Sequence, residues 1–327
     1  DLLHLIVQNL LSPAVLFFAL GVAAGWFKSD LEVPESISRY LSIYLMMSIG
    51  FKGGVAIANT KDMSAQVVFT LLAGLLVGLA QPFIGYALLR FTTALDSATA
   101  AAVAAHYGSI SIVTFATASA FVTANKLPYA GYIVAILALM EAPAILSGLF
   151  IAHRANPQTK HSGEEKKLAR EIFTNGAILL LFGSFAIGCV TGQPGMDKIA
   201  GFLETPYQGV LCLFLLDMGL LVSKNLHHLS GFTARLGLFG VYMPLVGATT
   251  GLGLSKLIGL DLGTATLFTV LCASASYIAV PAAMRLALPE AKPAIYLPMS
   301  LAITFPFNVA LGIPLYYSVA QRFLITH

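Results

Sequence analysis

Two Ser-x-Ser sequences inside long apolar segments are the residues of this chain most suited to chemistry. One is Gly108-Ser109-Ile110-Ser111, and the other is Ala273-Ser274-Ala275-Ser276, with Pro281 following. Serine is a favoured N-cap, and a half-helix that begins at such a break directs free N–H groups and a positive dipole end toward it. Such an end suits an anion. The residues expected to line an anion site are Gly108, Ser109, Ser111, Ser274, Ala275 and Ser276.

A purely structural interpretation stands beside this one. Small hydroxyl side chains in an apolar helix also allow close packing or bond back to their own turn. Packing or local hydrogen bonding accounts for either Ser-x-Ser sequence taken alone. The occurrence of both sequences in two related segments favours an anion site.

A carboxylate deep in an apolar segment is the second candidate feature. Glu141 occupies such a place, where an ionised side chain costs about 2.5–3.5 kcal/mol or more and usually marks a functional pathway. It needs a cation, a proton, or the hydroxyls of Ser109 and Ser111 as partner. Thr304 and Asn308 offer neutral oxygens of the kind that a sodium ion accepts. A neutral, hydrogen-bonded Glu141 is the structural alternative.

Three other polar residues are weaker candidates for a functional site. Asp217 is, like Glu141, a carboxylate in an apolar span, but it lies nearer a helix end. His106 is expected to be a hydrogen-bonded packing residue, and Lys52 can extend its ammonium group to the membrane surface.

Composition indicates the class of protein that these residues serve. Of 327 residues, 57% are hydrophobic and 10% are charged, and the mean hydropathy is +0.84. Soluble domains carry about 25% charged residues, so the chain is predicted to be an integral membrane protein. The three cysteines are far apart in apolar runs and are expected to be reduced. The basic residues do not form a stripe, so nucleic-acid binding is not predicted. The sequence contains no catalytic motif, so neither an enzymatic activity nor a cofactor is predicted.

Long apolar runs without alternation predict helices rather than a barrel. A helix of roughly 20 residues crosses the hydrocarbon layer, and ten such windows can be marked off by polar, Pro or Gly residues. The expected spans are 10–27, 36–58, 65–90, 97–122, 128–152, 172–191, 205–224, 231–258, 262–286 and 293–320.

Five spans precede a hydrophilic loop and five follow it, so the two halves enter the membrane in opposite orientations. Glu141-Ala142-Pro143 and Thr304-Phe305-Pro306 occupy corresponding places in the fifth and tenth spans. An inverted repeat is therefore predicted, with residues 1–154 as the first five-helix unit, 155–170 as the loop and 171–327 as the second unit.

The distribution of basic residues predicts the orientation. With loop 155–170 in the cytoplasm, twelve of the 18 Lys and Arg residues lie inside and six outside. Both termini are then outside.

Several of these segments are similar to one family. Leu11-Ser12-Pro13, Val33-Pro34-Glu35, Ile49-Gly50-Phe51-Lys52-Gly53-Gly54, the Ser109-x-Ser111 break, Glu141-Ala142-Pro143 and the Pro281 to Arg285 stretch resemble the SbtA-type sodium-dependent bicarbonate transporter family. The resemblance covers nearly the whole chain.

The resemblance implies an inner (plasma) membrane transporter with a core and a gate domain. It implies a homotrimer that takes up bicarbonate with sodium at the broken fourth and ninth helices, and a small PII-like cytoplasmic regulator, although loop 155–170 is short. Ser109, Ser111, Ser274 and Ser276 would line the anion site. A cation site would draw on Ser109, Glu141, Tyr277, Thr304 and Asn308.

The chain departs from the family pattern at two places. Ser109-Ile110-Ser111-Ile112 replaces Ser-Gly-Ser-Thr, and Tyr277 stands where family members carry an Asp. The missing carboxylate is a natural sodium ligand, so the coupling ion and the substrate stay open. The alternatives are a bile-acid-type sodium-coupled symporter of organic anions and a membrane receptor or scaffold that binds an anion without transport.

Overall fold

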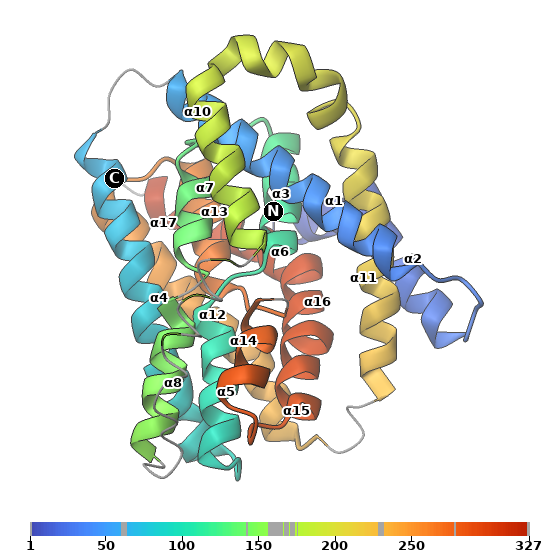
Figure 1. Cartoon of the computed structure of the whole chain (residues 1–327), viewed down its shortest axis with the longest axis vertical. Coiled ribbons are helices and arrows are strands. Elements are labelled where there is room, and N and C mark those ends of the chain that lie inside the picture. Colours follow the sequence, from blue (N-terminus) through green and yellow to red (C-terminus); the bar gives the residue numbers. More distant parts are fainter. Residues whose placement is uncertain are drawn as a thin grey trace.

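The chain is helical wherever it can be described. The computed structural model describes residues 2–59, 64–141, 143–155, 176–227, 232–277 and 279–325, and also residues 166, 170 and 174. These residues contain no strand, and Figure 1 shows their helices packed side by side. The predicted all-α class is confirmed. The predicted loop 155–170 lies almost entirely outside the described residues, as do Ala142, Lys61 and the side chain of Arg285.

The first half of the chain contains two helices that stop close to the middle of an apolar segment, one at Gly108 and one at Leu139. Its helices are α1 (Leu2–Leu10), α2 (Pro13–Trp26), α3 (Glu35–Ala58), α4 (Ala65–Thr92), α5 (Ser97–Gly108), α6 (Ile112–Ala124), α7 (Ile133–Leu139) and α8 (Pro143–Ala155).

The second half ends in an irregular helical segment. Its helices are α10 (Gly176–Leu203), α11 (Tyr207–Leu226), α12 (Ala234–Ile258), α13 (Leu262–Ala273), α14 (Ala279–Ala287), α15 (Pro293–Pro298), the π-helical η3 (Met299–Thr304), α16 (Phe305–Phe307), the π-helical η4 (Asn308–Gly312) and α17 (Ile313–Ile325).

The helices bear out most of the predicted spans. Among the described residues, eight segments are long and apolar enough to cross a membrane, and nine if α1 and α2, which meet at a 61° bend, form one span. The remaining predicted span, 262–286, is divided, because α13 has 12 residues and α14 begins only after a break. A total of ten spans therefore stays a prediction.

The predicted end of the sixth span coincides with a break in α10. The Gly192-Gln193-Pro194-Gly195 sequence predicts a helix end at 191, and α10 consists of two helices that meet at a kink at Gly192. Gly192 has φ 58° and ψ −155°, a conformation that glycine adopts at no steric cost. The first helix therefore ends at the predicted place, and a second helix follows it to Leu203.

Four helices associate as two pairs through glycine contacts, α2 with α11 and α3 with α10, and the hydrogen bond from Ser38 of α3 to Asp217 of α11 joins the pairs. A Cβ on Gly21 of α2 would lie 2.2 Å from the Leu216 carbonyl oxygen of α11, and one on Gly54 of α3 would lie 2.0 Å from the Phe185 carbonyl oxygen of α10. Such contacts let membrane helices approach closely where no side chain intervenes. We call α2, α3, α10 and α11 the gate group, and α4–α8 with α12–α17 the core group.

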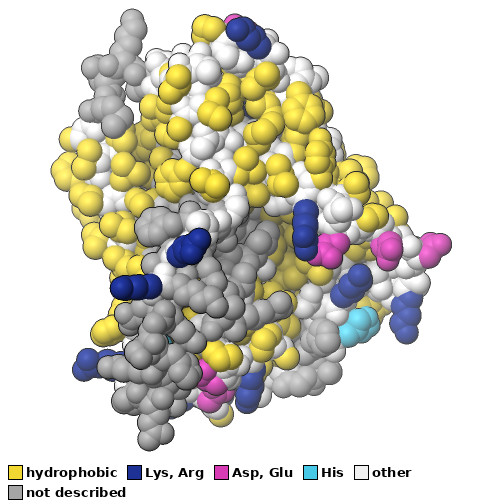
Figure 2. Space-filling model, in the orientation of Figure 1, with side chains coloured by type: hydrophobic (Ala, Val, Ile, Leu, Met, Phe, Trp, Pro, Cys, Tyr) yellow, Lys and Arg dark blue, Asp and Glu magenta, His cyan; other side chains and the backbone are white. Residues whose placement is uncertain are grey.

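Apolar side chains cover much of the surface. Figure 2 shows hydrophobic side chains over most of the visible face, with charged side chains in a few places. Phe91 is 88% exposed, Val190 87% and Leu257 85%. Large exposed apolar side chains in such numbers are expected where lipid, rather than water, surrounds the protein.

Candidate functional site

The first break separates α5 from α6. Helix α5 ends at Gly108, and the next residue, Ser109, has an extended backbone (φ −96°, ψ −166°). Ser111 is the N-cap of α6, and its Oγ accepts hydrogen bonds from the Thr114 N–H at 3.1 Å and the Thr114 hydroxyl at 2.9 Å. The predicted start of a half-helix at Ser111 is confirmed. Its first turn leaves N–H groups without intrahelical partners.

The second break separates α13 from α14. Ser274 follows α13 in an extended conformation (φ −85°, ψ 164°), and its Oγ donates to the Leu271 carbonyl at 3.0 Å. Residues 274–277 are not helical. The Oγ of Ser276 then accepts a hydrogen bond from the Val280 N–H at 3.2 Å, in the first turn of α14. A helix interrupted at the second Ser-x-Ser sequence is therefore also confirmed.

Two hydrogen bonds join the breaks to each other. The Ser111 N–H donates to the Ser274 Oγ at 3.2 Å, and the Ser276 N–H donates to the His106 carbonyl at 2.9 Å. All four serines of the two breaks are buried. Residues more than 160 positions apart in the chain thus meet at one place inside the protein.

The two half-helices that lead to the breaks, α5 and α13, start in different parts of the molecule. Asp96 caps α5, and its Oδ1 lies 3.7 Å from the Lys292 Nζ. The start of α13 instead contacts the α6–α7 connection, where the Ala130 N–H donates to the Thr264 Oγ1 at 2.8 Å. In Figure 1, α5 lies near the lower end of the molecule and α13 higher. The two breaks are therefore approached from opposite directions.

Glu141 lies beside the first break, between α7 and α8. Its side chain is buried, with 3% exposure. The Ser109 hydroxyl donates at 2.9 Å to the main-chain carbonyl of Glu141 rather than to its carboxylate, and the carboxylate Oε2 has no hydrogen-bond partner among the described residues. Of the partners offered for the carboxylate, the Ser109 hydroxyl therefore bonds the backbone of Glu141 instead, and the Ser111 hydroxyl bonds Thr114. The carboxylate is left as a buried acceptor.

Asn308 lies at the second break. Its Nδ2 donates to the Ala273 carbonyl, the last residue of α13, at 2.9 Å. Its Oδ1 accepts from the Tyr316 hydroxyl at 2.7 Å. The Asn308 side chain belongs to η4, and π-helical turns are often found at functional sites.

Thr304 precedes Asn308 and is the last residue of η3. Its hydroxyl donates to the Gly240 carbonyl at 2.6 Å and lies 2.5 Å from the Tyr107 hydroxyl. It therefore contacts α12 and, through Tyr107, the end of α5 next to the first break.

Tyr277 brings its ring between the two parts of the site. The ring packs edge-on against Phe305, with centroids 5.4 Å apart, and the hydroxyl lies near the Ser111 side chain. Tyr277 is buried, with 7% exposure. A phenol thus stands where the family pattern has a carboxylate.

The remaining polar candidates have other partners. The Asp217 carboxylate accepts a hydrogen bond from Ser38 in the gate group. The His106 Nδ1 lies 2.5 Å from the Ala102 carbonyl, and its ring stacks on Tyr296. Lys52 lies over the Tyr207 ring.

One residue at the site was not singled out in the sequence. The Gln81 Nε2 donates to the Cys272 carbonyl at 3.1 Å, and the side chain is 2% exposed. An amide next to Pro82 inside an apolar span is the signal that could have revealed it.

The arrangement combines two half-helix starts with a buried carboxylate. The half-helix starts suit an anion, and the buried Glu141 carboxylate suits a cation or a proton. A search of curated proteins found no match to the chain. A family model described as the Na+-dependent bicarbonate transporter superfamily matches residues 13–321, a range that contains both breaks. The chain belongs to the Na+-dependent bicarbonate transporter superfamily.

Proposed function

We propose that the protein imports bicarbonate together with sodium and that both ions bind where the two breaks meet. The observation that carries this proposal is the reciprocal pair of hydrogen bonds from Ser111 to Ser274 and from Ser276 to His106. These bonds bring the starts of α6 and α14 to one buried place. A monoanion there would interact with N–H groups from both half-helices.

The cation would bind next to the anion. The buried Glu141 carboxylate supplies a charge, while Asn308, Thr304 and the Tyr277 hydroxyl supply neutral oxygens in the neighbouring segments. An anion and a cation in adjacent positions each offset the cost of burying the other. We therefore expect that neither ion binds well alone, which is the basis of coupled transport.

Alternating access would arise from movement between the two helix groups. Glycine contacts join the helices of the gate group in two pairs, which the Ser38–Asp217 hydrogen bond connects, and the core group contains both breaks. Movement of the gate group across the core would open the site to one side and then to the other.

The proposal includes an architecture and an assembly. It takes residues 1–154 and 171–327 as inverted repeats, places both termini outside and loop 155–170 in the cytoplasm, and assigns the protein to the inner membrane as a homotrimer without enzymatic activity. The Asp-x-x-Thr caps at the starts of α5 and α13 support the repeat. A PII-like regulator, if it binds, would contact the cytoplasmic face.

Isotope uptake into proteoliposomes tests the function. Labelled bicarbonate should accumulate with an inward sodium gradient and should not accumulate when potassium replaces sodium. Bicarbonate accumulation that is the same with and without the sodium gradient would contradict the coupling of bicarbonate to sodium. Bile acids and other organic carboxylates are added as competitors, and inhibition by them at low concentration would favour an organic-anion symporter. Equilibrium binding of bicarbonate without flux would favour a receptor.

A further inference from the structure

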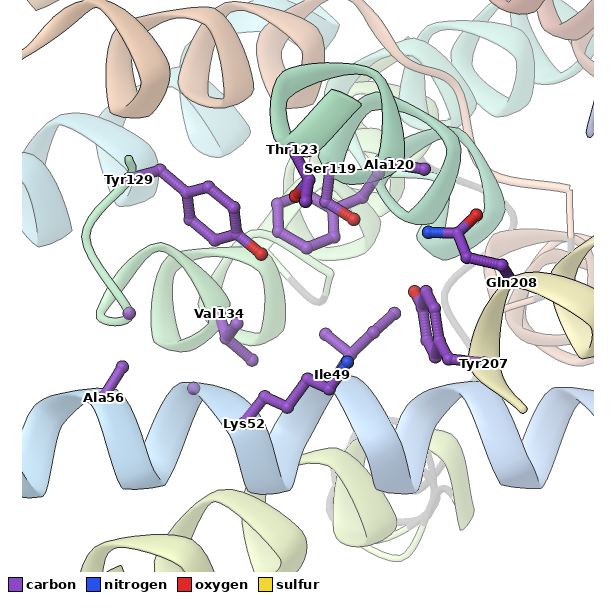
Figure 3. Close-up of a pocket in the computed structure, with 13 residues that line it drawn as sticks. Ile49, Lys52, Ala56, Ser119, Ala120, Thr123, Tyr129, Val134, Tyr207 and Gln208 are labelled. Atoms are coloured by element: carbon purple, nitrogen blue, oxygen red, sulfur yellow. The ribbon is translucent and has the colours of Figure 1, made fainter. Parts of the chain in front are cut away.

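A cavity of about 250 Å³ lies outside the two breaks, between α3 of the gate group and α6 of the core group (Figure 3). Helices α7 and α11 close its sides, so residues of both groups line it. A water molecule occupies about 30 Å³ of liquid, so the cavity has room for a small ion and several waters.

The lining is basic and rich in hydroxyl groups. Lys52 is the one charged residue among the 13 that line the cavity, and none is acidic. Thr123, Tyr129 and Tyr207 contribute hydroxyl groups, as does Ser119, whose hydroxyl donates to the Ala116 carbonyl at 2.9 Å. Figure 3 shows the hydroxyls of Tyr129 and Tyr207 directed into the space between α3 and α6. A cation surrounded by potential donors suits an oxyanion.

Lys52 has only weak compensation for its charge. Its Nζ lies 4.5 Å from the centroid of the Tyr207 ring, a cation–π contact. Within the described residues no carboxylate lies within 4.0 Å of the Lys52 ammonium. The negative charge of Glu204, in the connection between α10 and α11, attracts the ammonium from farther away. An ammonium group inside a membrane span is costly unless it is paired. A bound anion would supply the missing partner.

The cavity is close to the breaks. Phe115 lines it, and the Phe115 N–H donates to the Ser111 carbonyl at 3.0 Å, in the first turn of α6. One helical turn thus separates the N-cap of α6 from the cavity, which extends along α6 toward the end that the predicted orientation places outside.

We propose that the Lys52 cavity is a second anion site, in which a small oxyanion such as bicarbonate is held by the Lys52 ammonium before it reaches the breaks. This inference rests on the proposed function for the identity of the anion. Because α3 and α6 belong to different groups, the site exists only while the gate and core groups are in the arrangement seen here.

Protection of Lys52 from a small amine-acylating reagent tests occupancy without transport. The full-length protein in lipid nanodiscs is labelled at fixed pH and ionic strength in sodium bicarbonate or sodium gluconate, and each lysine is quantified by mass spectrometry. At a bicarbonate concentration of twice the dissociation constant, labelling of Lys52 should slow by about threefold, in proportion to the unoccupied fraction. Equal labelling in both salts across the concentrations that saturate uptake would overturn the inference.

Lys256 is the internal control for this experiment. Its Nζ lies over the Phe323 ring at 4.3 Å, the same kind of contact that Lys52 makes, but it does not line the cavity. Its labelling should be equal in the two salts. If bicarbonate slows both lysines alike, the effect is not occupancy of the cavity, and the inference fails.

Uptake kinetics give a second readout. Lys52→Met should raise the KM for bicarbonate about fivefold and leave the maximal rate nearly unchanged, as loss of one partly screened charge predicts. Lys52→Arg should restore the wild-type KM, and Lys256→Met should not change it. An unchanged KM in Lys52→Met contradicts the proposal.

The two proposals fail in different ways. If the wild-type protein protects Lys52 in bicarbonate but moves no bicarbonate, the second anion site stands and the proposed transport does not. If bicarbonate is transported with sodium but Lys52 is never protected, the transport stands and the second site is wrong.

Discussion

The two breaks share a topology but differ in chemistry. In the first, three residues separate α5 from α6, and the Ser111 side chain accepts two hydrogen bonds from Thr114. In the second, α14 begins at Ala279, and Ser276 accepts a single hydrogen bond from Val280. The first break is therefore built around a well-capped helix start.

The second break is built around the helix end that precedes it. Gln81 and Asn308 donate to the carbonyls of Cys272 and Ala273, the last two residues of α13. At the end of α5, the His106 carbonyl instead receives the Ser276 main-chain N–H. Glu141 is linked to the first break through its main-chain carbonyl, which accepts from Ser109. We infer that the segment at the first break supplies the charge for the cation and that the second break supplies neutral groups.

The largest effect is expected at Glu141. Glu141→Gln removes the one charge proposed for the cation site and should lower sodium-dependent uptake by about a hundredfold, which corresponds to roughly 3 kcal/mol. Uptake as a function of sodium concentration measures it. The matched change in the other half is Thr304→Val, which removes a neutral hydroxyl and should have a much smaller effect. Equal losses in the two variants would contradict the assignment of the cation to the first break.

The serines that bond the first turns of α6 and α14 give the next effect. Ser111→Ala removes an N-cap with two hydrogen bonds and should lower the free energy of unfolding by about 2 kcal/mol, whereas Ser276→Ala removes the single hydrogen bond to the Val280 N–H and should lower it by about 1 kcal/mol. Unfolding in detergent by urea measures both values. The reverse order would show that the second break depends more on its serine than the hydrogen bonds indicate.

Local sequence carries the information about where the helices break. Serine caps, and Pro281 after the second Ser-x-Ser sequence, act within a few residues, so the breaks at Ser109 and Ser274 could be predicted from the chain alone. Apolar length likewise predicts the spans. The Gly192-Gln193-Pro194 sequence likewise marks the kink in α10, one residue after the predicted end of the sixth span. The second helix that follows directly to Leu203 depends on the packing around the kink, which local sequence does not give.

The partners of the site residues depend on distant segments. Ser109 donates to the backbone of Glu141, and Gln81 reaches Cys272 across 191 positions. No spacing in the sequence encodes either contact. The π-helical turns around Pro306 are equally non-local, since the Asn9 side chain of α1 donates to the carbonyls of Val309 and Ala310 there.

Substitution of the amides at the second break should lower the free energy of unfolding more than substitution of any side chain at the end of α5. Gln81→Leu or Asn308→Leu leaves a buried carbonyl of α13 without its donor and should cost about 1 kcal/mol of unfolding free energy. Bicarbonate affinity should fall as well, because the α13 end positions Ser274. The His106 carbonyl has a main-chain donor, so His106→Phe should leave that hydrogen bond intact. Stability of the three variants by urea unfolding, with bicarbonate binding, provides the comparison. A loss in His106→Phe as large as in Asn308→Leu would remove the distinction between the two helix ends.

The smallest effect is expected at the starts of the two half-helices. Burial acts to raise the pKa of the Asp96 carboxyl, but hydrogen bonds from Thr99 and the nearby Lys292 ammonium outweigh it, so this pKa lies below its ordinary value. A carboxyl with a lowered folded-state pKa stabilises the fold above its unfolded pKa, and the contribution disappears as the pH falls through the folded pKa.

Asp96→Asn keeps a good N-cap and loses only the charge, so it should lower the unfolding free energy at neutral pH by about 0.5 kcal/mol. The difference from wild type should vanish as the pH falls below the lowered folded-state pKa of Asp96. Asp261→Asn alters the matching cap of α13, whose carboxylate has no ion pair among the described residues, and should cost less. A double-mutant cycle with Lys292→Met measures the ion pair directly. A coupling energy near zero would mean that the two half-helix starts differ in sequence context but not in stability, and the asymmetry of the two halves would then be confined to the breaks.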